Sequence, residues 1–386
     1  MSDIKQLVVD AKAWRRNFHQ HPELGFAEHQ TSQQVADLLT SFGLEIHTGI
    51  GVTGVVGVLK NGDGPSIGLR ADMDALPIQE LGAPEHKSQH SGCMHACGHD
   101  GHTAMLLGAA RHLAATKPFN GTIYFVFQPA EENLGGAQKM IEDGLFTRFP
   151  MDAIYGLHNW PGLPAGHISV NDGAMMASLD TFDIKVTGKG CHAAMPHMGI
   201  DPIVAASDIV LRLQTIVSRH ISPLESAVVS ITMFNSGEAI NVLPESASLQ
   251  GTVRCLNGVV RDQVQTLLEG YIDSYNQSPG LSVELTYHQG YPVTMNHVEH
   301  AEIVSQVANK HLGDERSHRN TPPSMASEDF AFMLNECPGA YFWLGVDEEE
   351  SIALHNPYYD FNDNVIEVAI RFWCDLVKQR LPIHKE

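Results

Sequence analysis

The stretch TIYFVFQPAEE, Thr122 to Glu132, places an apolar run directly before Pro129 and two adjacent acidic residues. Its β-branched and aromatic side chains predict a buried strand over 122–128. Open α/β sheets have their ligand crevice at the carboxyl ends of the strands, which is where Glu131 and Glu132 follow. In an extended backbone the side chains of Glu131 and Glu132 would diverge, so that one carboxylate binds metal while the other faces bound water. Taken alone, the two acids could equally begin a solvated helix, because a helix dipole favours acids in its first turn.

Helical and strand patterns alternate on both sides of this stretch. Strands that alternate with helices predict a layered α/β sheet with helices on its faces. The expected elements are a helix at 27–42, strands at 52–59 and 66–70, a helix at 101–115, the strand at 122–128, a helix at 135–143 and a strand at 153–158.

The pattern changes near Leu179 and changes back after Tyr291. The middle part has the order β-α-β-β-α-β, which is typical of a ferredoxin-like α+β unit with its own core. We therefore expect residues 1–178 and 292–386 to form one discontinuous domain with a mostly parallel sheet, and 179–291 to form an inserted domain. The expected elements of the inserted domain are strands at 181–188, 227–234, 247–255 and 281–288, and helices at 202–220 and 259–276. After Tyr291 the first domain resumes with helices at 302–311, 328–334 and 364–380 and a strand at 340–344.

Composition excludes several classes of partner. The 386 residues carry 24 basic and 45 acidic side chains, and the net charge of -21 disfavours nucleic acid and anionic membranes. No apolar run reaches the roughly 18 residues that a membrane helix needs, and the first residues do not resemble a secretory signal. Six cysteines without such a signal indicate reduced thiols. We expect a cytoplasmic protein.

The densest group of ligand-type side chains is CMHACGHDGH, Cys93 to His102. Cys97 and His99 flank Gly98, so their side chains would point to the same side of an extended segment. A closed structural zinc site that also uses Cys93 and His102 is the alternative, but the two-part spacing of zinc fingers is absent. The segment therefore favours a catalytic metal site.

Further candidates follow other predicted strands. His158 ends the strand at 153–158, and Asp72 and Asp74 follow the strand at 66–70, so all three belong to the edge that holds Glu131. His355 lies in a polar loop before the last helix. A single histidine at a strand end is more often an ordinary surface or core residue. Ligating imidazoles usually donate to a carboxylate, however, which makes an aspartate at this edge chemically expected.

Three familiar motifs are excluded. Gly49 to Gly54 spells G-x-G-x-x-G but leads into a strand, so no helix N-terminus is offered to a pyrophosphate. Gly64 to Gly68 spells G-x-S-x-G, yet its serine opens a strand and stands on no strand-to-helix elbow. H-E-x-x-H does not occur in the sequence.

The order of motifs along almost the whole chain resembles one family. It is the hippurate hydrolase and indole-acetyl-amino-acid hydrolase group within the co-catalytic zinc aminoacylase and carboxypeptidase superfamily. The motifs are HPELGFAE (His21 to Glu28), RADMDALP (Arg70 to Pro77), MHACGHDGH (Met94 to His102), QPAEE (Gln128 to Glu132), GLHNWP (Gly156 to Pro161), GKGCHAAMPH (Gly188 to His197), NVLPESA (Asn241 to Ala247), GTVR (Gly251 to Arg254), SEDF (Ser327 to Phe330) and LHNPYYDFND (Leu354 to Asp363).

The resemblance implies a centre of two divalent metal ions. Cys97 would bridge them, with His99 and His158 completing one position and Glu132 and His355 the other. A bridging thiolate favours zinc, although manganese, cobalt and nickel are also possible.

The resemblance also implies roles in catalysis and substrate binding. Glu131 would be the general base that takes a proton from metal-bound water. His192 would stabilise the oxyanion, reaching the partner's site in a homodimer formed through the inserted lid domain. Asn241 and Arg254 would hold the carboxylate of the substrate, and Asp74 would orient a ligating side chain by hydrogen bonding to it.

The expected activity is hydrolysis of the amide bond in small N-acyl amino acids. A dipeptidase or carboxypeptidase of the same fold would need the same metals and the same carboxylate clamp. A metal-binding homologue without turnover is a third alternative, which Glu131 beside Glu132 argues against because a structural site needs no base.

Overall fold

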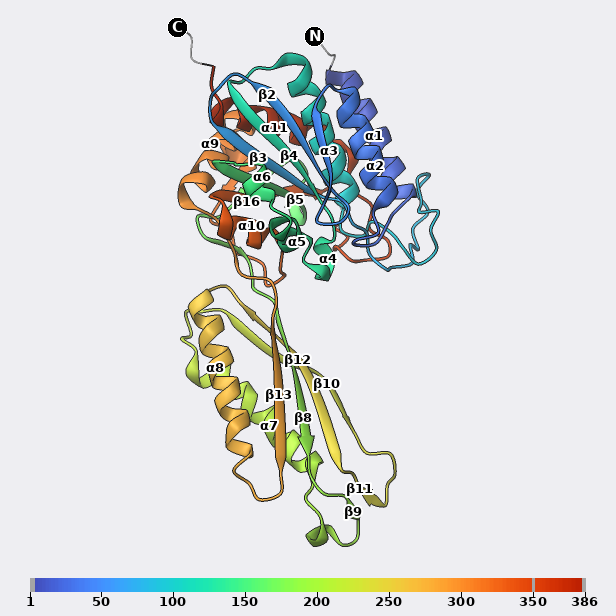
Figure 1. The fold of residues 1–386 in the computed structure, drawn as a ribbon, viewed down its shortest axis with the longest axis vertical. Helices are drawn as coiled ribbons and strands as arrows, with labels where there is room; N and C mark the ends of the chain where they lie inside the picture. The colour runs from blue at the N-terminus through green and yellow to red at the C-terminus, as the bar shows by residue number, and fades with distance from the viewer. Residues whose placement is uncertain (1–3, 349–350, 384–386) are drawn as a thin grey trace. The chain divides into compact units, whose positions relative to one another are not determined.

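The computed structural model describes residues 4–348 and 351–383 and divides into two compact units (Figure 1). Unit 1 runs through Met175 and then comprises Met295–Pro322 and the chain from Asp329 onward. Unit 2 comprises Met176–Thr294 and Pro323–Glu328. The segment Pro323–Glu328, which the sequence pattern grouped with the first domain, thus belongs to unit 2. That the units act as a catalytic domain and a lid stays a prediction.

Unit 1 is built on an eight-stranded sheet in the order β1-β2-β4-β3-β5-β16-β6-β15. The strands β4, β3, β5 and β16 are parallel neighbours, whereas β1 and β2 add an antiparallel edge. This confirms the predicted α/β class with a mostly parallel sheet. The strands are β1 (Glu45–Ile50), β2 (Gly54–Asn61), β3 (Ser66–Asp72), β4 (Gly121–Gln128), β5 (Ala153–Pro164), β6 (Ile168–Val170), β15 (Ser317–Arg319) and β16 (Gly339–Asp347).

Helices cover both faces of this sheet. Helices α1, α2, α3, α9 and α11 share one hydrophobic core with strand residues such as Phe125, Tyr155 and Phe342. The short helices α4, α5 and α6 follow β4 and α10 precedes β16. Phe330 of α10 would lie 3.2 Å from a Cβ at Gly156, on the face of β5 opposite to Tyr155. The helices of unit 1 are α1 (Ile4–Gln20), α2 (His29–Ser41), α3 (His99–Thr116), α4 (Glu131–Leu134), α5 (Gly136–Glu142), α6 (Leu145–Arg148), α9 (Val298–Leu312), α10 (Phe330–Glu336) and α11 (Ile366–Arg380).

The parallel register brings the carboxyl ends of three strands together. Asp72 at the end of β3 pairs with Gln128 at the end of β4. On the other side of β3, Arg70 pairs with Gly156 of β5, so that His158 lies level with Asp72. β3 is buried almost throughout, as expected for a parallel strand with helices on both faces. Side chains from distant parts of the sequence therefore meet at this edge.

Unit 2 has the element order β-α-β-β-α-β. Its sheet is antiparallel in the order β10-β12-β8-β13, with α7 and α8 on one face (Figure 1). Asp201 caps α7 by accepting N–H bonds from Ile203 and Val204. The elements are β8 (Asp180–Thr187), β9 (Cys191–His192), α7 (Pro202–Thr215), β10 (Ala227–Ser236), β11 (Val242–Leu243), β12 (Ser246–Cys255), α8 (Gly258–Tyr275) and β13 (Ser282–Gln289), and the chain passes between the units at β7 (Ala174–Met176) and β14 (Thr294–Met295).

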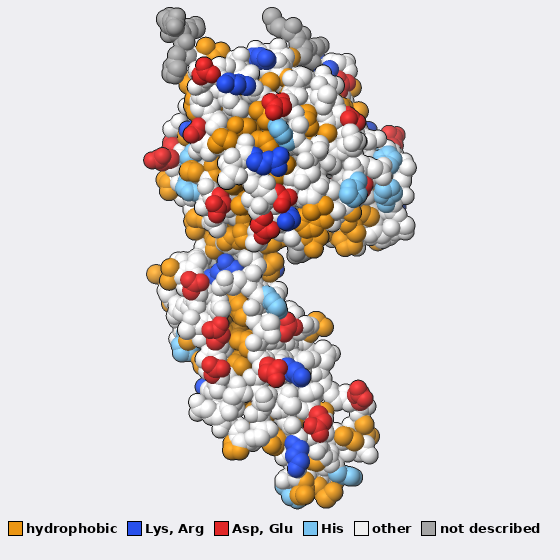
Figure 2. All heavy atoms as spheres, in the orientation of Figure 1, with side chains coloured by type: hydrophobic (Ala, Val, Ile, Leu, Met, Phe, Trp, Pro, Cys, Tyr) orange, Lys and Arg blue, Asp and Glu red, His pale blue; other side chains and the backbone are white. Residues whose placement is uncertain are grey.

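The surface carries the strong acidity of the sequence. Figure 2 shows acidic side chains spread over the visible face of each unit rather than gathered in a single patch. Among the residues that the structure describes, no helix is both long and apolar enough to cross a membrane.

Candidate metal centre

The five predicted metal ligands meet at the carboxyl edge of the sheet in unit 1. The sulfur of Cys97 lies 3.5 Å from His158 Nε2, and Glu132 Oε1 lies 3.1 Å from His355 Nε2. Ligand atoms of Cys97, Glu132 and His355 all fall within 4.8 Å of one another, and the same holds for His99, Glu131 and Glu132. Such a mixture of thiol, imidazole and carboxylate donors suits late first-row divalent metals.

The turn at Gly98 differs from the extended segment that was expected. Gly98 has a φ of 88° and caps α3, whose first residue is His99. A Cβ at this position would lie 2.4 Å from Asn159 Oδ1, so both the backbone angle and the close approach require glycine. Cys97 and His99 converge because of this left-handed turn and the helix start, and not through alternation along a strand.

Hydrogen bonds fix which nitrogen of each imidazole faces the centre. His99 Nδ1 donates to the carbonyl oxygen of Asp74 at 2.9 Å, and His158 Nδ1 donates to its neighbour's carbonyl oxygen, that of Asn159, at 2.6 Å. Nε2 of His99 is buried and makes no hydrogen bond to the described residues, since Asp72 Oδ2 lies 3.7 Å away, beyond hydrogen-bond reach. A buried imidazole nitrogen without a partner is unfavourable unless a ligand occupies it. The donor set therefore fits a metal ion.

Carboxylates give this edge an excess of negative charge. Burial would lower the pKa of His99, but the nearby carboxylates of Asp72 and Asp74 outweigh it and raise the pKa to about 10. Burial, followed by the charges of Glu132 and Glu131, raises the pKa of the Cys97 thiol well above its usual value. A thiolate is stable here only beside a cation, which is the charge that a divalent ion supplies.

The carboxylate of Asp74 contacts both His99 and Glu132. Its Oδ1 lies 3.2 Å from His99 Nδ1, and its Oδ2 accepts the backbone N–H of Glu132 at 2.9 Å. One carboxylate therefore holds the imidazole of His99 and the backbone of Glu132 at the same time. This geometry supports the predicted role of Asp74 as an orienting residue.

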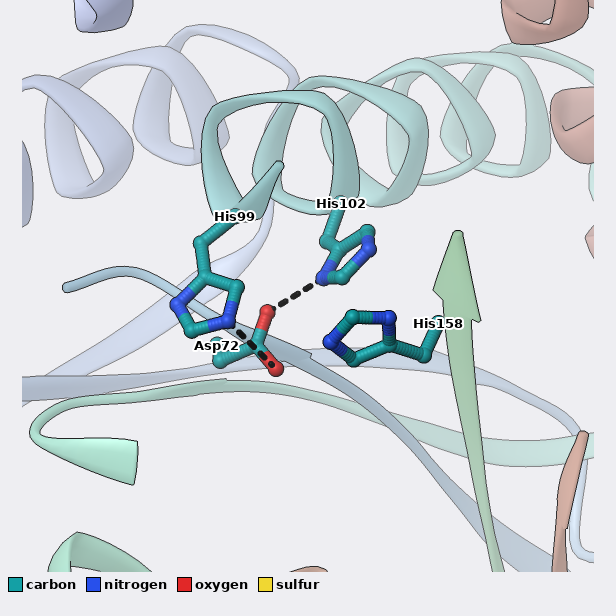
Figure 3. Close-up of side chains that lie close together, drawn as sticks. All are labelled: Asp72, His99, His102 and His158. Carbon is teal, nitrogen blue, oxygen red and sulfur yellow. Dashed lines mark hydrogen bonds and ion pairs between the residues drawn. The ribbon is translucent and has the colours of Figure 1, made fainter. Parts of the chain in front are cut away.

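A neighbouring cluster contains Asp72, His99, His102 and His158 (Figure 3). His102 Nδ1 donates to Asp72 Oδ1 at 2.5 Å, and His102 Nε2 accepts the backbone N–H of Asn159 at 3.0 Å. His102 therefore has both ring nitrogens occupied. Asp72 Oδ2 accepts a bond from Arg70 Nη1 at 2.8 Å and lies 3.7 Å from His99 Nε2.

The sequence did not predict that His102 and Arg70 both bond to Asp72. The motif RADMD contains the signal for one of them, since residues two apart share a face of a strand. Arg70 and Asp72 indeed lie on the same side of β3. The partner of His102 could not be found in this way, because it follows from the packing of α3 against β3.

Glu131 and Glu132 begin the four-residue helix α4, so the expectation of an extended backbone is wrong. Ala130 precedes them with φ 53° and ψ 44°, a left-handed conformation that few residues other than glycine adopt. The solvated-helix alternative also fails for Glu131, which is only 6% exposed. Its Oε1 accepts the backbone N–H of Asp329 at 3.3 Å.

His355 is held by the loop that carries Cys97. Its backbone N–H donates to the carbonyl oxygen of Ala96 at 2.8 Å, and its φ of 62° is again left-handed. The side chain is 51% exposed. Strained backbone of this kind is characteristic of functional sites.

The remaining predicted site residues lie in unit 2. The backbone N–H of Ala193 donates to the carbonyl oxygen of Asn241 at 3.0 Å, so His192 and Asn241 are neighbours across β9 and β11. Arg254 lies at the opposite end of β12 and donates to Ser327 Oγ at 2.9 Å. Residues 246 to 254 of this strand alone span about 26 Å at about 3.3 Å per residue. Unit 2 does not bring Arg254 together with the other two.

This fold and this donor set are those of a metallohydrolase, and one family accounts for them. Residues 68–379 match the model of peptidase family M20/M25/M40. The chain belongs to this family.

Individual relatives cover nearly the whole chain. Hippurate hydrolase of Campylobacter jejuni is 44% identical over 380 residues, which is 98% of each protein. N-acetyl-L-cysteine deacetylase of Bacillus subtilis is 38% identical over 374 residues, covering 96% of this chain and 88% of the relative. The crystal structure of the Bacillus subtilis YXEP protein, a dinuclear metal-binding peptidase from the M20 family, superposes with a TM-score of 0.82 at 34% identity over 97% of this chain and 98% of that one.

Proposed function

We propose that the protein is a metal-dependent amidohydrolase that releases amino acids from their N-acyl derivatives at a two-metal centre in unit 1. The observation that carries the proposal is the meeting of Cys97, Glu132 and His355 beside a buried Glu131. The names of the relatives, hippurate hydrolase and N-acetyl-L-cysteine deacetylase, support the choice of substrate class. A net charge of -21 disfavours nucleic acid as the substrate.

The metal positions follow from the donors. Cys97 would be shared, with His99 and His158 completing one position and Glu132 and His355 the other. Zinc is the expected metal, and manganese, cobalt and nickel are the alternatives. When bound, two such ions polarise an amide carbonyl and make water more acidic.

Glu131 performs the proton transfers. Attack of water on the amide carbon requires removal of a proton from that water, and cleavage requires delivery of a proton to the amine nitrogen. Glu131 lies within 4.8 Å of ligand atoms of His99 and Glu132, so its carboxylate can reach both positions. The bond from the Asp329 N–H to Glu131 Oε1 fixes the direction of the carboxylate.

Residues of unit 2 bind the substrate. His192 stabilises the oxyanion, and Asn241 and Arg254 bind the free carboxylate, for which the guanidinium fork is suited. Because Arg254 lies about 26 Å or more along the sheet from His192, one small substrate cannot contact both residues of the same chain. This separation supports a homodimer in which His192 and Asn241 of one chain serve the site of the other.

A dipeptidase or carboxypeptidase is the second candidate, favoured by the YXEP protein, whose description is that of a peptidase. The two functions differ in the group on the acyl side of the scissile bond. A purely structural metal site is disfavoured, because it would have no use for the base Glu131.

A substrate panel tests the proposal. Enzyme stripped by a chelator and reloaded with zinc, manganese, cobalt or nickel is incubated with N-acetyl and N-benzoyl amino acids and with unblocked dipeptides. We expect metal-restored release of free amino acid from the acylated compounds. Cleavage of dipeptides alone would replace the proposal with the peptidase, and inactivity on the whole panel with metal bound would contradict both.

A further inference from the structure

The loop that carries the proposed base depends on an unusual backbone conformation. Ala130 is left-handed, and the two following residues are Glu131 and Glu132, whose directions it sets. An alanine in this conformation is strained, so surrounding contacts must hold it. These contacts determine where both carboxylates point.

Three carboxylates hold the segment 130–137, which includes α4 and the start of α5, by accepting its backbone N–H groups. Asp74 Oδ2 accepts from Glu132 N at 2.9 Å, and Asp329 Oδ2 accepts from Ala137 N at 2.9 Å. The third is Glu28, whose Oε1 accepts from Ala130 N at 2.8 Å. Glu28 thus bonds directly to the residue with the strained conformation.

Glu28 is itself completely fixed. The residue has 0% exposure, and its Oε2 accepts a bond from Thr53 Oγ1 at 2.6 Å. Burial raises the pKa of Glu28 to about 7. The segment of Glu28 also packs tightly on the loop, since a Cβ added at Gly25 would lie 3.0 Å from the Cβ of Ala130 and 2.9 Å from Leu134 Cδ1.

We infer that Glu28 is a positioning residue that holds Ala130 in the left-handed conformation and thereby aims Glu131 and Glu132 into the centre. Its effect on turnover rests on the proposed function. Its effect on the metal position completed by Glu132 does not, so the two can be tested separately.

Two substitutions separate the hydrogen bond from the charge. In Glu28→Gln, the amide oxygen can still accept from Ala130 N–H, and the amide nitrogen can donate to Thr53, whose hydroxyl also accepts. In Glu28→Ala, the N–H of Ala130 is left buried without its acceptor. Geometry therefore predicts that glutamine rescues what alanine loses.

We expect Glu28→Ala to lower kcat on the order of 100-fold, because small displacements of catalytic groups have effects of this size. KM should change little, and the variant should bind zinc more weakly by about 10-fold or more. Glu28→Gln should remain within about threefold of the wild type in both, well below the change that a displaced group produces. Val35→Ala, at a buried position of α2, is the control for a general loss of stability and should lower Tm without changing kcat or zinc affinity.

Gly25→Ala supplies a second approach that leaves Glu28 intact. The added methyl group pushes on Ala130, so kcat and zinc affinity should fall as in Glu28→Ala. If Glu28→Ala does not fold, Gly25→Ala still tests whether the position of Ala130 controls kcat and zinc affinity. Wild-type kcat and zinc affinity in Gly25→Ala would overturn the inference, as would a glutamine variant that is as impaired as the alanine variant.

The absorption spectrum of the cobalt-loaded protein gives a readout without turnover. We expect the cobalt bands of Glu28→Ala to differ from those of the wild type and those of Glu28→Gln to match them. Identical spectra in all three proteins would overturn the inference. If the wild type hydrolyses no N-acyl amino acid but the spectra behave as expected, the proposed function fails and the role of Glu28 stands.

Discussion

Replacement of Glu131 by glutamine is expected to reduce kcat by about 1,000-fold or more while the protein keeps its metal ions. Glutamine has the same shape and can still accept the N–H of Asp329, but it cannot take up a proton. The loss should therefore fall on kcat and leave KM nearly unchanged. Steady-state kinetics and metal analysis of the same preparation measure both quantities.

The control for this variant is Glu142→Gln. Glu142 is the last residue of α5, and its side chain is 54% exposed, so its replacement should leave turnover unchanged. Loss of metal from Glu131→Gln would show that Glu131 is a metal ligand. Near wild-type turnover in Glu131→Gln would show that Glu131 is not the general base.

Cys97→Ala is expected to have the second large effect, the loss of metal from both positions. The sulfur is the one donor that we assign to both ions, so its removal weakens each of them. Turnover should fall to background at micromolar metal, because neither ion is then retained. Metal content per chain after gel filtration, followed by hydrolysis of an N-acyl amino acid, measures the effect.

Cys374→Ala is the matched control, since Cys374 is also a buried thiol of unit 1 but lies in the core on α11. It should keep its metal and lose only stability. A Cys97→Ala protein that retains two ions and full activity would contradict the bridging assignment. Retention of one ion would assign Cys97 to a single position.

Much of the fold is predictable because the parallel strands are buried on both faces. Strands such as 122–128 and 153–158 form apolar runs whose carboxyl ends must share an edge of the sheet. The sequence pattern alone therefore predicts that Glu132 and His158 lie at the same edge. Helix α1 was missed for an equally physical reason. Two of its core positions are occupied by Arg15 and His19, which hide the apolar periodicity.

These polar core residues of α1 are stabilised by distant acids. Arg15 Nε bonds to Asp363 at 2.7 Å, and His19 Nδ1 bonds to Asp100 at 2.8 Å. Their partners lie in the last part of the chain and in the metal loop, so local periodicity carries no information about them.

The candidate site is likewise predictable from the sequence only in part. Ligand types and their common edge follow from the order of strands, whereas the directions of the side chains do not. The left-handed turns at Gly98 and Ala130 start α3 and α4, and they overturned the extended backbones expected for Cys97 and Glu131. An alanine with a positive φ has no sequence signature, since its conformation is imposed by contacts such as that of Glu28.

The central claim, metal-dependent hydrolysis at a two-metal centre, is tested most directly by titrating zinc into chelator-stripped enzyme while the release of glycine from N-benzoylglycine, or of amino acid from the best acylated substrate of the panel, is followed. The account predicts no turnover without zinc and a rise that reaches its plateau at two ions per chain. Full turnover in the stripped protein, or zinc binding at two ions per chain with no turnover on any acylated amino acid, would contradict it.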